Sequence, residues 1–191
     1  MKTSNQLATD TINMIIDEWH KLPDNGFQLH IEDWAPEWAL TKAAGQKTDD
    51  ALIGLDRTPI KEVDLPESVK KALGLLASNA LHVYGGAVPV EVAPPDYDGE
   101  VVDTITIYYE EIIHDARDED DLRRMVREYV RHEWRHGCQF VWLRQHGLSP
   151  LDALISENGT LYGCGPLESD AHSFQRGVEN PLDEAMRSFI A

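Results

Sequence analysis

Apolar residues recur every three or four positions between Leu122 and Val141, and this spacing predicts one long helix. Asp118 stands at the expected N-cap, where its side-chain oxygen can accept a hydrogen bond from the first turn. The helix can run to Gln145, with Gly147 as its stop. The inward positions are Leu122, Met125, Val126, Tyr129, Val130, Glu133, His136 or Gly137, Phe140 and Val141. This stripe is apolar except near the middle of the helix, where polar side chains interrupt it.

The remaining pattern divides the chain into further helices and a few short strands. A period of three to four residues predicts helices over 4–20, 36–44, 66–84, 167–176 and 182–189. A period of two predicts strands over 27–31, 88–92 and 101–109. The last strand is the strongest, because it is β-branched and places Thr104 and Thr106 on one face and Ile105 and Ile107 on the other.

The pattern is weakest between Gly45 and Leu65, where Asp and Pro residues interrupt it. A long stretch without a sustained period indicates a linker or a mobile loop. We therefore expect residues 1–65 to form an N-terminal segment of helix, strand and mobile loop, a candidate lid or arm. Residues 66–191 then form the main domain, although a chain of 191 residues is also short enough for one compact domain.

The strong acidity of the chain limits its expected partners. The formal net charge is −17, whereas binding to a phosphate backbone favours a basic surface, so we expect no nucleic-acid partner. Five arginines of the long helix follow an acidic first turn, and pairing with it predicts a solvated face for them. They are Arg123, Arg124, Arg127, Arg131 and Arg135.

The distribution of apolar residues indicates a soluble, cytoplasmic protein. No apolar run approaches the about 20 residues that a membrane span needs, so we expect no membrane partner. The first residues lack the apolar core of a secretory signal. The two cysteines, Cys138 and Cys164, are then expected to be reduced. Nothing in the sequence indicates an oligomeric state.

The polar positions in the middle of the long helix form the pattern His-Glu-x-x-His, from His132 to His136. Residues four apart on a helix lie one above the other, so both imidazoles can bind one metal ion. Glu133 can reach a metal-bound water rather than the metal, and would act there as general base. Two imidazoles and a carboxylate on a buried stripe are costly without a partner, which favours a metal over a hydrogen-bonded pair of core histidines. A catalytic zinc usually takes three protein ligands, so a third is required.

The third ligand is expected on a separate element downstream. Glu168 is the first candidate, and Cys164, Asp170 and His172 are alternatives, because zinc accepts oxygen, sulfur and nitrogen donors. An exposed acid favoured by the helix dipole is the structural alternative for Glu168. Tyr162 lies between the ligands, where its phenol can stabilise an oxyanion or can be an ordinary half-buried side chain.

The two helices together resemble the gluzincin metallopeptidases, the thermolysin-like group that includes small members of minimal type. The residues that carry this resemblance are His132, Glu133, His136, Gln139, Glu168, Ala171 and Phe174. In that family the glutamate of the second helix is the third zinc ligand, so the resemblance implies this role for Glu168. Two residues depart from the family pattern. His172 stands where an Asp or Asn usually orients a zinc histidine, and Arg135 stands where a small or apolar residue is usual.

The resemblance implies an α+β, zincin-like fold with a small mixed or antiparallel sheet, an active-site helix and a following ligand-bearing helix. It also implies zinc-dependent hydrolysis of peptide or protein substrates, with Glu133 activating the zinc-bound water. The strand over 104–109 is then expected at the cleft edge, where it would pair with an extended substrate. A non-catalytic metal-binding protein with a regulatory or interaction role is the alternative, favoured by Arg135, His172 and the N-terminal segment. A non-peptide amide hydrolase is a third possibility.

Overall fold

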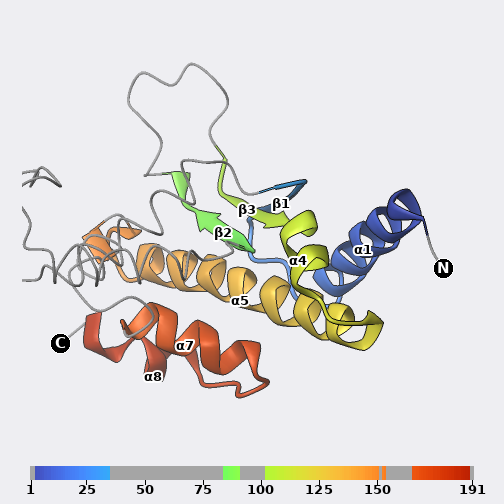
Figure 1. Cartoon of the computed structure of the whole chain (residues 1–191). Helices are drawn as coiled ribbons and strands as arrows, with labels where there is room; N and C mark the ends of the chain where they lie inside the picture. Colours follow the sequence, from blue (N-terminus) through green and yellow to red (C-terminus); the bar gives the residue numbers. More distant parts are fainter. Residues whose placement is uncertain (1–2, 35–83, 91–101, 151, 154–164, 190–191) are drawn as a thin grey trace, which may run out of the picture.

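The computed structural model describes residues 3–34, 84–90, 102–150, 152–153 and 165–189 (Figure 1). One helix, α5 (Glu119–Gln145), runs through the middle of this structure. A three-stranded sheet packs on one side of α5, and the shorter helix α7 (Pro166–Gln175) packs on another (Figure 1). Most of the core lies between α5, the sheet and the N-terminal helix. This is the α+β arrangement that the sequence predicts.

The sheet has the strand order β1-β3-β2 and is mixed. Strand β1 (Gln28–Glu32) runs parallel to the central strand β3 (Thr104–Tyr108). Strand β2 (Gly85–Val88) runs antiparallel to β3 on its other side. The predicted two faces of β3 are confirmed, because Ile105 and Ile107 are fully buried and enter the core. The sequence predicts a small mixed or antiparallel sheet, and the structure has the mixed form.

Strand β3 lies in the centre of the sheet, so the prediction that residues 104–109 form the cleft edge is wrong. Ile105 is opposite Leu29 of β1 on one side and opposite Ala87 of β2 on the other. Both sides of β3 are therefore occupied by neighbouring strands. Within the described residues β2 pairs only with β3, which makes β2 the edge strand next to α5.

Strand β2 begins earlier than the strand predicted over 88–92. Gly85 and Gly86, which the sequence places at the end of a helix, instead form its first half. Pairing with β3 stops where Val88 lies opposite Thr104, because β3 itself begins there. Residues 89 and 90 are therefore not part of the strand, and the remainder of the predicted range, 91–92, lies outside the described residues.

Helix α5 has the predicted bounds and caps. The Asp118 carboxylate accepts a hydrogen bond from the backbone N–H of Asp121, and Gly147 ends the helix with a φ of +70°. Most of the predicted apolar stripe is buried, including Leu122, Val126, Val130 and Phe140, whereas Tyr129 and Val141 are partly buried. Every residue from His132 to Gly137 is also buried, because other elements cover this part of the helix on several sides.

The N-terminal residues share the core with α5 and the sheet. Helix α1 (Ser4–Trp19) matches the predicted helix and begins with a capping box at Thr3. Ile15 of α1 and Phe27, just before β1, are both buried in the core. The described part of the N-terminal segment is thus packed against the motif helix.

Two of the short helices differ from the prediction. Helix α4 (Tyr109–Asp115) follows β3 directly, where the sequence predicts no helix. Helix α7 agrees with the helix predicted over 167–176. The helix predicted over 182–189 is divided into α8 (Leu182–Ala185) and a 3-10 turn (Arg187–Phe189).

The arginines of α5 have two different environments. Arg123 and Arg124 pair with acidic residues of the first turn, as predicted. Arg131 and Arg135 instead face α7, with guanidinium carbons 4.4 and 5.0 Å from the centre of the Phe174 ring. The prediction of a solvated face is therefore wrong for these two residues, because α7 covers them.

Several predicted features lie outside the described residues. These are the helices over 36–44 and 66–84, the weak pattern over 45–65 with its domain boundary, and the side chains of Tyr162 and Cys164. The domain division therefore stays a prediction. Among the helices that are described, none has the length and apolar character needed to cross a membrane.

Candidate metal centre

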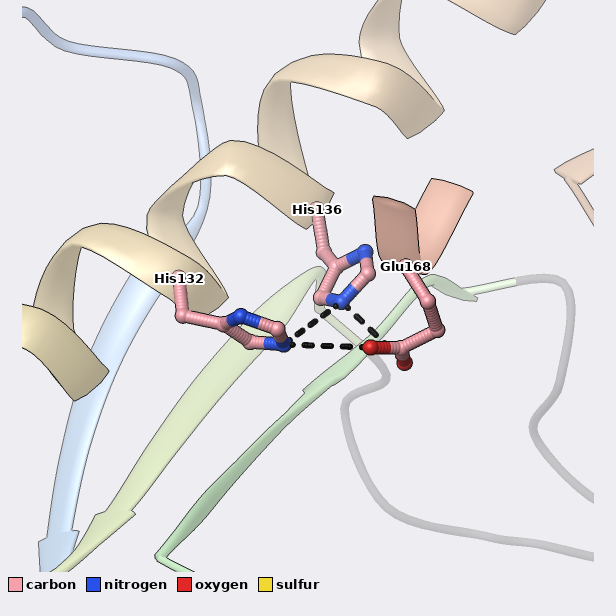
Figure 2. A group of neighbouring side chains, drawn as sticks. All are labelled: His132, His136 and Glu168. Atoms are coloured by element: carbon pink, nitrogen blue, oxygen red, sulfur yellow. Dashed lines mark hydrogen bonds and ion pairs between the residues drawn. The ribbon is translucent and has the colours of Figure 1, made fainter. Parts of the chain in front are cut away.

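Three side chains from two helices converge beside the sheet (Figure 2). His132 and His136 lie one turn apart on α5, and Glu168 extends toward them from the first turn of α7. The two Nε2 atoms are 3.1 Å apart, and each lies 3.4 Å from a Glu168 carboxylate oxygen. The long helix thus supplies two nitrogens, and α7 supplies an oxygen on the same side.

The spacing of these atoms fits one small metal ion. Ligand atoms about 2.0–2.1 Å from a tetrahedral zinc ion lie about 3.3 Å from one another. The two nitrogens are 3.1 Å apart, His132 Nε2 lies 3.4 Å from Glu168 Oε2, and His136 Nε2 lies 3.4 Å from Glu168 Oε1, so each ring has a carboxylate oxygen at close to this distance. Two imidazoles and one carboxylate also form a usual donor set for a catalytic zinc. The cluster therefore has the donors and the approximate spacing of a metal site.

Both imidazole rings are oriented by the side-chain amide of a glutamine. His136 Nδ1 lies 2.8 Å from Gln139 Oε1, and His132 Nδ1 lies 3.1 Å from Gln175 Oε1. An amide oxygen only accepts hydrogen bonds, so each Nδ1 carries a hydrogen and each Nε2 of a neutral ring presents a lone pair. Two lone pairs that face each other repel unless a proton or a metal ion lies between them. This geometry disfavours the alternative of a neutral hydrogen-bonded pair of core histidines.

The electrostatics of the cluster favour a positive charge at its centre. Burial alone would raise the pKa of Glu168, but His136 and His132 hold it well below its ordinary value. Burial alone would lower the pKa of His136, but the Glu168 carboxylate raises this pKa to about 9. A metal cation would supply the same positive charge and would displace the proton from His136.

The other ligand candidates lie near the cluster without joining it. The Asp170 carboxylate is bound by Arg135 at 2.7 Å and by Gln139 at 2.8 Å. The ring of His172 lies against the His132 ring, with centroids 4.7 Å apart, and its Nε2 is 3.8 Å from Glu168. Among the described residues, the group that could hold an ion contains neither of them. Cys164, the remaining alternative, lies outside the described residues.

Gln175 is a site residue that the sequence reasoning missed. Its Oε1 is 3.1 Å from Nδ1 of both His132 and His172. Glu168, His172 and Gln175 are separated by four and three residues, so they share one face of α7. That spacing was the available signal, since it extends the ligand face of α7 by one turn.

Glu133 lies next to His132 on α5 and faces strand β2. Its side chain is buried, and the backbone N–H of Ala87 donates a hydrogen bond to it. Burial raises the pKa of Glu133, and the Glu168 charge acts in the same direction against the opposing effect of the histidines. A raised pKa makes a carboxylate a better proton acceptor near neutral pH.

Two glycines allow the close packing around the motif. A Cβ at Gly85 of β2 would lie 2.7 Å from Glu133 Cγ and 2.9 Å from the carbonyl oxygen of Thr106. A Cβ at Gly137 of α5 would lie 2.6 Å from Asn25 Nδ2. The edge strand and the N-terminal segment can therefore approach α5 this closely only because both positions lack a side chain.

A comparison with protein families agrees with this arrangement. The family model described as Zincin-like metallopeptidase matches residues 55–141. The fold is zincin-like. The zincin-like match covers less than half of the chain, and it includes β2, β3 and both histidines but ends before Glu168. Comparisons with curated proteins and with solved structures gave no match.

The zincin-like match indicates a metallopeptidase, and such proteins typically bind zinc. The match does not identify the thermolysin-like subtype, and it does not identify a substrate. The structure alone identifies Glu168 of α7 as the oxygen donor of the cluster, because residues after 141 are outside the matched range.

Proposed function

We propose that this protein is a zinc-dependent peptidase of gluzincin type, with His132, His136 and Glu168 as metal ligands and Glu133 as general base. The observation that carries this proposal is the convergence of two imidazoles and one carboxylate at separations of 3.1 to 3.4 Å. The zincin-like match to the same helix supports a peptidase rather than another metal-binding class.

A zinc ion held by these residues would supply Lewis acidity, which would polarise a substrate carbonyl and lower the pKa of a bound water to about 7. Glu133 accepts the proton of the attacking water on its carboxylate and then donates it to the leaving amine. The burial that raises the pKa of Glu133 supports this role. Tyr162 remains a candidate donor to the oxyanion.

Strand β2 is the proposed docking strand for the substrate. The N–H of Ala87 donates to Glu133, so the edge of β2 that pairs with no strand among the described residues faces the proposed base. An extended peptide paired with this edge would therefore present its carbonyl groups beside Glu133. Val88 and Val90 are exposed at the end of β2 and offer apolar contacts to the peptide.

The test combines metal analysis with a mixed peptide library read by mass spectrometry. The parent protein is expected to hold one zinc per chain and to cleave a subset of peptides. A parent that holds zinc but cleaves nothing would favour the non-catalytic metal-binding alternative. Cleavage of amides other than peptide bonds would favour the amide hydrolase.

A further inference from the structure

A buried ion pair lies directly behind the metal ligands. Arg135 Nε and Nη2 donate to the two Asp170 carboxylate oxygens at 2.7 and 3.0 Å. The side chains are only 7% and 4% exposed. Arg135 Nη2 also donates to the carbonyl oxygen of Asn180 at 2.6 Å. Two charges withdrawn from water at this depth are held in one fixed geometry.

This ion pair determines the orientation of the Gln139 amide. Gln139 is fully buried, and its Nε2 donates to Leu167 O at 2.9 Å and to Asp170 Oδ2 at 2.8 Å. A carbonyl and a carboxylate can only accept, so the NH2 group must face them. The amide cannot turn over without losing both bonds, and its oxygen therefore faces His136 Nδ1 at 2.8 Å.

The glutamine that contacts His132 is not held by an ion pair in the described part of the chain. The oxygen of Gln175 is shared by Nδ1 of His132 and Nδ1 of His172. Within the described part of the chain, no carboxylate binds the NH2 group of Gln175. Of the two imidazole ligands, and among the residues that the structure describes, His136 alone has an amide partner that is itself bound by an ion pair.

We propose that Arg135, Asp170 and Gln139 are positioning residues: the ion pair fixes the Gln139 amide, and this amide fixes the His136 tautomer that presents Nε2 to the metal. The proposal rests on the proposed function only in that the cluster binds a metal; it does not require peptide hydrolysis. It gives a role to Arg135, whose presence beside a metal histidine departs from the family pattern. The acidic partner of Gln139 thereby acts on His136 without touching it.

The first experiment determines the tautomer in the metal-free protein. Nitrogen-15 NMR of the histidine rings, recorded at a pH at which the rings are neutral, distinguishes a hydrogen on Nδ1 from one on Nε2. The parent is expected to carry it on Nδ1 of His136. Gln139→Met keeps the side-chain length and removes the acceptor, so the hydrogen is expected to populate Nε2 as well. Zinc affinity, measured by chelator competition, is expected to fall about 10–100-fold.

A second variant tests the ion pair, with a matched control at the same interface. Asp170→Asn is expected to shift the His136 tautomer in the same direction while leaving that of His132 unchanged. Arg131→Gln is the control, because Arg131 also packs on Phe174 but contacts Glu179 rather than Gln139. It is expected to leave the tautomer of His136 unchanged and zinc affinity within about twofold.

The outcomes separate positioning from a purely structural role. A structural ion pair would weaken zinc binding in Asp170→Asn by displacing α7, yet would leave the hydrogen on His136 Nδ1, and this result would overturn the proposal. If Asp170→Asn does not fold, Gln139→Met tests the proposal by itself. An unchanged His136 tautomer in Gln139→Met would also overturn the proposal. A parent that binds no zinc would refute the proposed function, whereas the tautomer measurement would still decide the role of Gln139.

Discussion

Replacing Gly85 by alanine is a direct test of how closely the edge strand packs on the proposed base. The described non-glycine residues all have negative φ, and Gly85 is not among the glycines with positive φ, so its backbone accepts alanine without strain. The cost of Gly85→Ala therefore comes from contacts alone. Its Cβ would lie 2.7 Å from Glu133 Cγ and 2.9 Å from the Thr106 carbonyl oxygen, so Glu133 or β2 must move.

The adjacent residue provides a matched control. A Cβ at Gly86 would have no heavy atom within 4 Å, while Gly86→Ala makes the same chemical change in the same strand. Crowding of a packed site typically costs about 1–3 kcal/mol. Alanine for glycine at a compatible site stabilises by about 0.4–1 kcal/mol through the unfolded state, and this term is common to both variants. We therefore expect Gly85→Ala to be about 2 kcal/mol less stable than Gly86→Ala.

Urea unfolding of the two variants gives the difference in free energy of unfolding. The kcat on a cleaved peptide reports the position of Glu133, and we expect it to fall about 10–100-fold in Gly85→Ala only. Zinc content should be unchanged in both, because neither glycine contacts a ligand. Equal stability and equal kcat of the two variants would contradict the close contact between β2 and Glu133.

Three further predictions concern the site and its support. Glu133→Gln should lower kcat about 10²–10⁴-fold with zinc retained, and an unchanged rate in the peptide assay would reject Glu133 as base. Glu168→Ala should lose most of its zinc by metal analysis, whereas loss in Cys164→Ser instead would reject the gluzincin ligand set. Burial alone would raise the pKa of Asp103, but Arg144 lowers it below the ordinary value. The ionised pair therefore stabilises the fold above the unfolded pKa of about 3.9, and this stabilisation is lost as pH falls through the folded pKa. Asp103→Asn should therefore reduce stability by about 1 kcal/mol at neutral pH, and the difference from the parent should disappear in acid-unfolding curves at low pH.

The long helix and its motif were predictable because their signals are local. The apolar spacing, the cap at Asp118 and the stop at Gly147 all lie within or beside α5, and its bounds agree with the prediction. Glu168 was predictable because it begins a helix marked by Pro166. Helix α4 was not predicted, because its seven residues make only about two turns, too few for a sustained helical period to stand out after the strand.

The strand positions depended on pairing, which the sequence pattern does not contain. The central place of β3 follows from its two neighbours, and one of them, β1, is more than 70 residues away in sequence. The role of β2 was hidden because Gly85 and Gly86 are typical of turns. The close approach of Glu133 and of the Thr106 carbonyl oxygen explains why glycine stands in a strand at this point.

Many polar contacts around the motif end on backbone carbonyl oxygens rather than on side chains. Four side chains of α5 donate such hydrogen bonds: Arg131 to the carbonyl oxygen of Phe174, Trp134 to that of Pro23, Arg135 to that of Asn180, and Gln139 to that of Leu167. A carbonyl group is the same in every residue, so such contacts constrain the path of the surrounding segments but hardly their composition. In evolution or engineering, single substitutions of exposed residues in these segments should be well tolerated, whereas insertions or deletions of one residue should not, since they displace the carbonyl groups from their donors.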